Sequence, residues 1–115
     1  MKTRKRLLVP LATVAEFDLM ITGRASALGT QLVDFWAPDC QPCVALKPIL
    51  REVARKTGKE IYTVNVDAPA LAELAKRFRI RGVPTVIAFR GGEPIGREIG
   101  LPEDPMAAYE KLLTR

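Results

Sequence analysis

The chain contains no histidine and only two cysteines among its 115 residues. Without histidine it cannot form a Ser-His-Asp triad, and a zinc site would need further ligands or carboxylates beside the two thiols. Two cysteines make at most one bridge, which excludes a disulfide-dense secreted scaffold. No segment approaches the roughly 20 apolar residues of a membrane-spanning helix. We therefore expect no metal, no cofactor and no transmembrane segment.

The excess of positive charge is concentrated at the start of the chain. The net charge is +5, and Lys2, Arg4, Lys5 and Arg6 supply four of these charges before the first acidic residue, Glu16. Subtracting the four leaves +1 for the other 109 residues. We expect a solvated tail, with weak attraction to anionic surfaces as the alternative, and no specific nucleic-acid partner.

Residues 1–15 also loosely resemble a secretory signal, because basic residues precede a short apolar run and a Thr-Val-Ala sequence. The run is short and contains Pro10, and the residues after it belong to the predicted fold. We expect a cytoplasmic protein. Export is the alternative if residues 1–15 are a cleaved signal.

Strand and helix patterns alternate along the chain, and the length favours one domain. Strands are predicted within 7–14 and at 31–36, 61–66, 84–90 and 95–99, helices at 14–22, 40–57, 69–78 and after Asp104, and a loop at 24–30. This order predicts an α/β fold with a single mixed sheet of about five strands, including a C-terminal antiparallel hairpin, flanked by about four helices. Residues 1–12 would form a basic extension with an irregular first strand, and residues 13–115 the domain.

Several local signals set the expected boundaries. Pro10 restricts the first strand to a sheet edge, and Thr13 with Glu16 three residues later is typical of a helix capping box. Pro48 lies inside the long helix and should kink it, whereas Gly58 should end it.

The chemistry is predicted to lie in the Cys-Gln-Pro-Cys sequence at residues 40–43. A separation of three residues at a helix start brings both sulfurs within bridging distance. Cys40 would lie beside free backbone N–H groups and the positive end of the helix dipole, which favour the nucleophilic thiolate. Cys43, one turn inward, could resolve a mixed disulfide, and Pro42 fixes the backbone between them. The alternatives are a structural bridge, two inert buried thiols, or half of a metal site completed by a second copy.

The residues around this motif are identified as those of a known family. Val33 to Cys43 resembles the active-site strand and loop of the thioredoxin family, and Ile80 to Thr85 resembles its loop with a cis-proline. Phe89 to Glu93 with Gly100 resembles its last hairpin, and Pro48 its kinked active-site helix. The resemblance covers roughly residues 13–114, so a thioredoxin fold is implied.

The resemblance implies a role for each matching residue. Cys40 would be the attacking thiolate and Cys43 the resolving thiol, with a cis bond between Val83 and Pro84 beside them. Asp34 would move a proton to and from Cys43, and its place in an apolar strand should raise its pKa and make it a base near neutral pH. The alternatives are an ordinary trans proline, and an aspartate that reaches water at a strand end.

The resemblance also implies how the protein meets its partners. Trp36 would pack behind the site, although it could equally be plain core, and no pocket is expected. The client surface would be a shallow apolar patch that includes Trp36, Gln41, Pro42, Val83, Pro84, Ile99 and Gly100. The implied partners are disulfide-containing client proteins and an electron donor like thioredoxin reductase, and we expect a monomer.

Three residues depart from the family pattern and should tune the site. Asp39 replaces a tryptophan before the first cysteine, removes apolar contact area and places a negative charge that disfavours the Cys40 thiolate. Gln41 replaces the usual glycine between the cysteines, where residues tune the reduction potential. Thr63 stands where members of the family often have a lysine that pairs with the buried aspartate. Asp34 should therefore lack that cation and have a higher pKa than in relatives that keep the lysine.

The sequence therefore predicts a thiol–disulfide oxidoreductase that reduces protein disulfides through the Cys40/Cys43 couple. A binding or adaptor module with little turnover is a second hypothesis, in which Asp39 and Gln41 mark a specialised interface. An exported oxidase or isomerase is a third.

Overall fold

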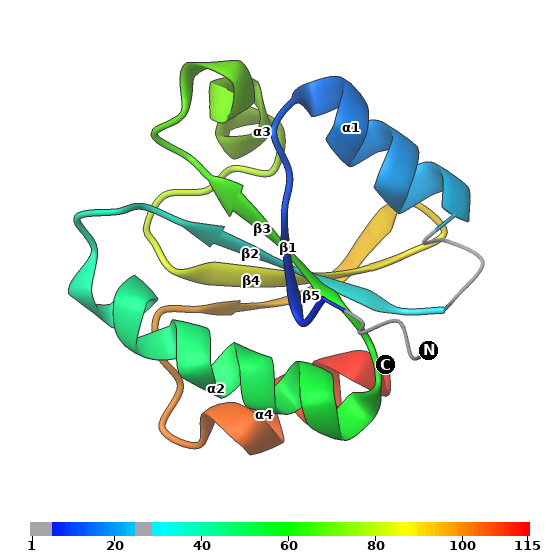
Figure 1. Cartoon of the computed structure of the whole chain (residues 1–115), viewed down its shortest axis with the longest axis vertical. Coiled ribbons are helices and arrows are strands. Elements are labelled where there is room, and N and C mark those ends of the chain that lie inside the picture. Colours follow the sequence, from blue (N-terminus) through cyan, green and yellow to red (C-terminus); the bar gives the residue numbers. More distant parts are fainter. Residues whose placement is uncertain (1–5, 25–28) are drawn as a thin grey trace, which may run out of the picture.

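The computed structural model describes residues 6–24 and 29–115, which form a five-stranded mixed sheet between two layers of helices (Figure 1). The basic residues up to position 5 and the centre of the predicted 24–30 loop lie outside the described residues. The elements in chain order are β1 (Leu8–Pro10), α1 (Val14–Leu19), η1 (Met20–Arg24), β2 (Gln31–Trp36), α2 (Gln41–Thr57), β3 (Ile61–Asn65), η3 (Pro69–Leu71), α3 (Ala72–Arg77), β4 (Thr85–Arg90), β5 (Glu93–Ile99) and α4 (Pro105–Leu113). The predicted fold class is confirmed.

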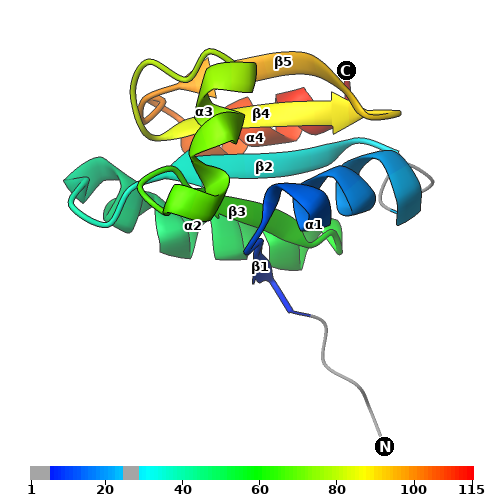
Figure 2. The same ribbon diagram turned by 90° about the horizontal axis from the view of Figure 1, so that it is seen from above.

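The strands lie in the order β1-β3-β2-β4-β5, which is visible when the molecule is seen from above (Figure 2). Strands β1, β3 and β2 run parallel, whereas β4 is antiparallel to β2 and β5 is antiparallel to β4. Pro10 lies on the edge strand β1, as predicted, because an edge strand tolerates the missing N–H.

Three predicted elements differ from the structure. The helix predicted at 14–22 is divided into α1 and the π-helical segment η1, which extends to Arg24. The helix predicted over 69–78 is divided into a 3₁₀ turn, η3, and the short helix α3, with Leu71 at the junction. The return strand begins at Glu93 rather than residue 95 and includes Pro94. Proline is tolerated there because β5 is the other edge strand and its pairing with β4 is irregular near Phe89.

The predicted local signals at two helices are confirmed. The Thr13 side chain accepts a hydrogen bond from the Glu16 N–H at 3.1 Å, and the Glu16 carboxylate accepts one from the Ala12 N–H at 2.9 Å. Helix α2 begins after Cys40 and ends at Gly58, whose φ of 73° is the left-handed conformation that glycine adopts without strain. Cys40 caps the N-terminal end of α2 and Gly58 its C-terminal end, so local sequence fixes both ends of the helix that contains Cys43.

Alternation along the strands gives the sheet two different faces. Val33 and Phe35 of β2 pack beneath α1 and α3, whereas Leu32 packs beneath α2 and α4. Asp34 has the same parity as Leu32 and pairs in register with Thr63 of β3 and Val86 of β4. The sheet register thus directs the Asp34 carboxylate toward the layer that contains α2 and therefore toward the helix of the two cysteines.

Candidate active site

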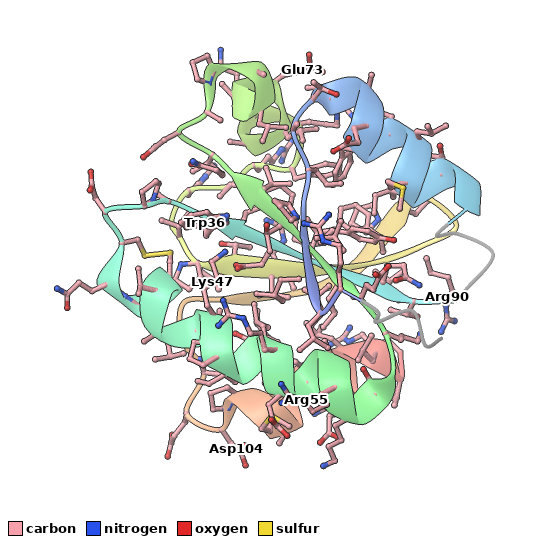
Figure 3. All side chains as sticks on the ribbon, in the orientation of Figure 1. Trp36, Lys47, Arg55, Glu73, Arg90 and Asp104 are labelled. Carbon is pink, nitrogen blue, oxygen red and sulfur yellow. A yellow bond between two sulfur atoms is a disulfide. The ribbon has the colours of Figure 1, made fainter. Side chains whose placement is uncertain are left out.

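Cys40 and Cys43 form a disulfide at the start of α2 (Figure 3), with their Cα atoms 5.2 Å apart. Cys40 is the N-cap of the helix, and the Cys43 N–H donates a hydrogen bond to Cys40 Sγ at 3.2 Å. Cys43 is fully buried, whereas Cys40 is partly exposed. A sulfur that reaches solvent at a helix N-terminus, with a second sulfur behind it, is the arrangement predicted for an attacking and a resolving thiol.

The loop before β4 lies against the outer cysteine. The Val83–Pro84 peptide bond is cis, which excludes the alternative of an ordinary trans proline. The Val83 carbonyl oxygen lies 3.6 Å from Cys40 Sγ. The loop is held by two hydrogen bonds of 2.7 Å, from the Thr85 hydroxyl to the Gly82 carbonyl and from the Gly100 N–H to the Pro84 carbonyl. Two segments distant in sequence therefore meet at the Cys40 sulfur.

Asp34 is fully buried in the middle of the sheet, so the alternative of a carboxylate reaching water is excluded. Neither of its oxygens has a hydrogen-bond partner among the described residues. Burial raises the pKa of Asp34 from 3.8 to about 6, although the charge of Lys47 partly offsets this effect. The upward direction of this shift agrees with the sequence analysis, whereas the role of Asp34 in proton transfer stays a prediction.

Asp34 lacks a lysine on the neighbouring strand, as expected, but a different lysine reaches it from α2. Thr63 does lie beside Asp34 on β3, but Lys47 of α2 places its Nζ 3.8 Å from Asp34 Oδ2. Lys47 was not among the predicted site residues. The available signal was its position four residues after Cys43, which places it one turn further along the same side of the helix.

Trp36 is partly buried at the end of β2, and the Lys47 ammonium lies 3.7 Å from the centroid of its ring (Figure 3). Lys47 thus contacts both a buried carboxylate and the face of an aromatic ring. Trp36 does more than fill core space, because its ring holds a charged group next to the site.

The surface around Cys40 contains both apolar and polar side chains. Ile99 is 70% exposed and Leu101 is 46% exposed, beside Gly100, whose N–H bonds to Pro84. Asp39, Gln41 and Pro42 are also exposed. Of the predicted client-contact residues, Gln41, Pro42 and Ile99 are exposed. Trp36, Val83 and Gly100 are only partly exposed, and Pro84 is buried.

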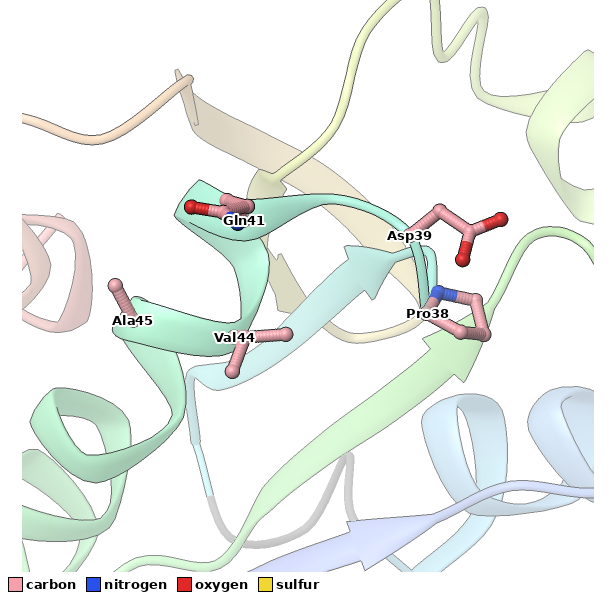
Figure 4. A pocket seen from close by; sticks show the side chains of 5 residues that line it. All are labelled: Pro38, Asp39, Gln41, Val44 and Ala45. Atoms are coloured by element: carbon pink, nitrogen blue, oxygen red, sulfur yellow. The ribbon is translucent and has the colours of Figure 1, made fainter.

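The expectation of no pocket was wrong, because a hollow lies beside the cysteines at the start of α2 (Figure 4). It has a volume of about 600 Å³ and is lined by Pro38, Asp39, Gln41, Val44 and Ala45. Val44 is 55% exposed within it. Two of the residues that depart from the family pattern, Asp39 and Gln41, thus line one recess next to the redox pair.

Two features are absent from the described ranges 6–24 and 29–115. These ranges contain no group of three or more cysteine, aspartate and glutamate side chains that could hold a metal ion. In the same ranges, no helix has the length and apolar character needed to cross a membrane. The arrangement fits thiol–disulfide exchange, which requires a nucleophilic thiol, a second thiol and a proton acceptor.

Comparison with known proteins supports the same assignment. The family model described as thioredoxin matches residues 9–110. The thioredoxin of Staphylococcus aureus is 31% identical over 96 residues, which are 83% of this chain and 88% of that protein. The bifunctional thioredoxin reductase/thioredoxin of Mycobacterium leprae is 38% identical over 69 residues, but these are 60% of this chain and only 15% of that protein. The crystal structure of Schistosoma mansoni thioredoxin has a TM-score of 0.80 at 27% identity, and the match covers 93% of each chain. The chain belongs to the thioredoxin family.

Proposed function

We propose that the chain is a thiol–disulfide oxidoreductase that reduces disulfide bonds in client proteins. The observation that carries this proposal is the pairing of a partly exposed Cys40 with a buried Cys43 at one helix N-terminus. The buried Asp34 on the facing strand and the cis-proline loop against Cys40 complete the set of groups that the reaction needs.

The reaction would proceed in two exchanges. The Cys40 thiolate attacks one sulfur of the client disulfide, forms a Cys40–client mixed disulfide, and releases the other client sulfur, which takes a proton. Asp34 then accepts the proton of Cys43, and the Cys43 thiolate attacks Cys40 Sγ. The Cys40–Cys43 bond forms, the second client sulfur leaves, and two electrons have passed to the client. A donor similar to thioredoxin reductase would return the two electrons.

Clients would dock on the apolar surface around the cysteines. Ile99 and Leu101 are exposed apolar side chains beside the Pro84 loop, and an extended client segment could pair with the backbone of Val83. Asp39 and Gln41, which line the hollow beside the cysteines, would select among clients. Asp39 favours a client with a basic side chain next to its disulfide, because opposite charges attract across an interface.

We place this activity in the cytoplasm. Cleavage after residue 15 would remove β1, which pairs with β3, and Leu11, which is buried in the core. Sequencing the N-terminus of the mature protein tests this location. A mature chain that begins at Glu16 would favour the exported alternative.

Turnover of insulin disulfides with dithiothreitol as the electron source tests the proposal. We expect the wild-type chain to accelerate the reaction and Cys40→Ser to fall to the rate of dithiothreitol alone. Lys111→Ala, on the surface of α4 and remote in sequence from the cysteines, serves as the control and should keep the wild-type rate. Equal rates for the wild-type chain and Cys40→Ser would sink the proposal.

A Cys43→Ser variant separates an enzyme from an adaptor module. With no resolving thiol, clients would accumulate as mixed disulfides on Cys40 that dithiothreitol releases. Many disulfide-linked clients support the oxidoreductase, whereas a single partner held without a covalent bond supports the adaptor.

A further inference from the structure

Lys47 occupies an unusual position for a lysine in a small protein. Its side chain comes from the second turn of α2 and is only 18% exposed. Its ammonium lies 3.8 Å from Asp34 Oδ2 and 3.7 Å from the centroid of the Trp36 ring. Lysine is rarely buried to this degree without a partner, so the two contacts indicate that the ammonium is held in place.

The surroundings of Asp34 contain few other ionisable groups. Its neighbours in register, Thr63 on β3 and Val86 on β4, carry no charge. From α4, the buried Tyr109 hydroxyl is within electrostatic reach, and the charge of Asp34 helps to raise the pKa of that phenol. Arg51, one turn beyond Lys47 on α2, acts on Lys47 as a like charge. Among the described residues, Lys47 is the one cation that forms an ion pair with Asp34.

We propose that Lys47 is a positioning residue that keeps Asp34 available as a carboxylate near neutral pH, and thereby sets the pH at which Cys43 can be deprotonated. This role rests on the proposed oxidoreductase function. The cation reaches Asp34 from the helix of the cysteines, and the strand position beside Asp34 holds the neutral Thr63 instead.

The position of Lys47 on α2 connects the ion pair with Asp34 to the resolving thiol, Cys43. Lys47 follows Cys43 by four residues, so the two side chains leave the same side of the helix one turn apart. The resolving thiol, its proton acceptor and the cation therefore share one buried region. Burial lowers the pKa of Lys47, whereas the charge of Asp34 raises it, so each group favours the charged form of the other.

The experiment is a ¹³C NMR titration of the Asp34 carboxyl in the oxidised protein, in which the cysteines do not titrate. The variants are Lys47→Met, Lys47→Arg, and Lys47→Met combined with Thr63→Lys. Methionine retains the apolar stem of lysine without its charge. We expect Lys47→Met to move the midpoint upward by about one pH unit, because an opposite charge at this distance lowers the pKa of a carboxyl by roughly that amount or more. We expect Lys47→Arg and the double variant to return the midpoint toward the wild-type value.

Lys59→Met is the matched control. Lys59 is also a partly buried lysine, but its ammonium donates to the Thr30 carbonyl at 2.8 Å, at the end of β2 away from the cysteines. We expect this variant to leave the Asp34 midpoint unchanged. An equal midpoint in the wild-type chain and Lys47→Met, or an equal upward shift in Lys59→Met, would overturn the inference. If Lys47→Met does not fold by circular dichroism, Lys47→Gln takes its place with the same expected direction.

Kinetics separate this inference from the proposed function. In the wild-type chain, the pH midpoint for release of a client from Cys40 should match the NMR midpoint, and Lys47→Met should shift both together. If the NMR midpoint shifts but the release profile does not, Lys47 acts on Asp34 without controlling Cys43, and the inference fails. If the wild-type chain does not reduce disulfides at all, the proposed function fails. The NMR titration would still show whether the charge of Lys47 acts on Asp34.

Discussion

The two faces of the sheet are built from the same strands but differ sharply in chemistry. Beneath α1 and α3, all four phenylalanines of the chain pack together, with Phe78 5.1 to 5.9 Å from the ring centroids of Phe17, Phe35 and Phe89. Polar side chains of β2 and β4 on this face lie at strand ends, as Gln31 and Thr85 do. The face beneath α2 and α4 instead has Asp34 at mid-strand.

One face of the sheet mainly stabilises the fold, whereas the other contains the polar groups of the proposed reaction. Aromatic packing stabilises one face through apolar burial and ring contacts. Among the described residues, the other face contains the Asp34 carboxylate and the Tyr109 hydroxyl as buried polar groups without hydrogen-bond partners, and these cost free energy. Among the same residues, the aromatic face has one such group, the Gln31 amide nitrogen, which lies at a strand end rather than at mid-strand. We infer that the buried carboxylate lowers the stability of the fold but is retained because Cys43 needs a proton acceptor. Removing an aromatic ring from one face should therefore destabilise the protein, whereas removing a buried polar group from the other should stabilise it or leave its stability unchanged.

Phe35→Ala on the aromatic face should have the largest effect on stability. The ring is fully buried, so its loss should lower the free energy of unfolding by about 3–5 kcal/mol through lost burial and the cavity that remains. Urea denaturation measures the change. Val44→Ala on the exposed surface of α2 is the control and should change it by less than about 0.5 kcal/mol. A similarly small loss for Phe35→Ala would remove the contrast between the faces.

Asp34→Asn on the polar face should stabilise the protein at pH 7 by up to about 3 kcal/mol. The folded-state pKa of Asp34, about 6, lies above the ordinary 3.8, so between these values the native chain holds a proton that the unfolded chain has released. The wild-type protein therefore loses stability as the pH rises from about 4 to about 6. Unfolding measured against pH should show this loss in the wild-type chain and not in Asp34→Asn. A variant that is less stable at pH 7 would contradict the account.

Thr13→Ala should lower the stability by about 1 kcal/mol, because the threonine side chain caps α1 over the aromatic face. Thermal unfolding measures this smaller effect. Thr13→Ser keeps the hydroxyl and is the matched control. Equal losses in both variants would show that the cap bond contributes nothing.

Tyr109→Phe should be neutral or stabilising by less than about 1 kcal/mol. The buried hydroxyl has no hydrogen-bond partner among the described residues, so its removal leaves no group unpaired. Chemical denaturation at pH 7 measures the change. A loss of 1 kcal/mol or more in the free energy of unfolding would show that the hydroxyl has a hydrogen-bond partner, such as a bound water. The polar face would then contain fewer unpaired groups than we infer.

Much of this architecture could be predicted from local sequence. The spacing of apolar residues predicted the strand at 31–36 and the long helix after it. Gly58 predicted where that helix ends. The Cys-Gln-Pro-Cys motif predicted the redox pair. The resemblance of Ile80 to Thr85 to the family's cis-proline loop predicted the cis bond between Val83 and Pro84.

The missed features depend on tertiary contacts. Lys47 reads as one more polar residue of an amphipathic helix until the register of β2 and β3 directs Asp34 toward α2. The hollow beside Asp39 depends on how the loop before α2 turns into the helix. The break between η3 and α3 is likewise invisible to helical spacing, since Leu71 and Leu74 are buried in either arrangement.

The central claim is that the buried Asp34 accepts the proton of Cys43 so that Cys43 can release the client from Cys40. Stopped-flow measurement of client release from a preformed Cys40 mixed disulfide, across pH 4.5 to 8.5 in the wild-type chain and Asp34→Asn, tests it directly. The account predicts that the wild-type rate rises with a midpoint at a pH of about 6, and that Asp34→Asn loses this inflection and is slower at pH 7 by about 100-fold. Superimposable profiles for the two proteins would contradict it.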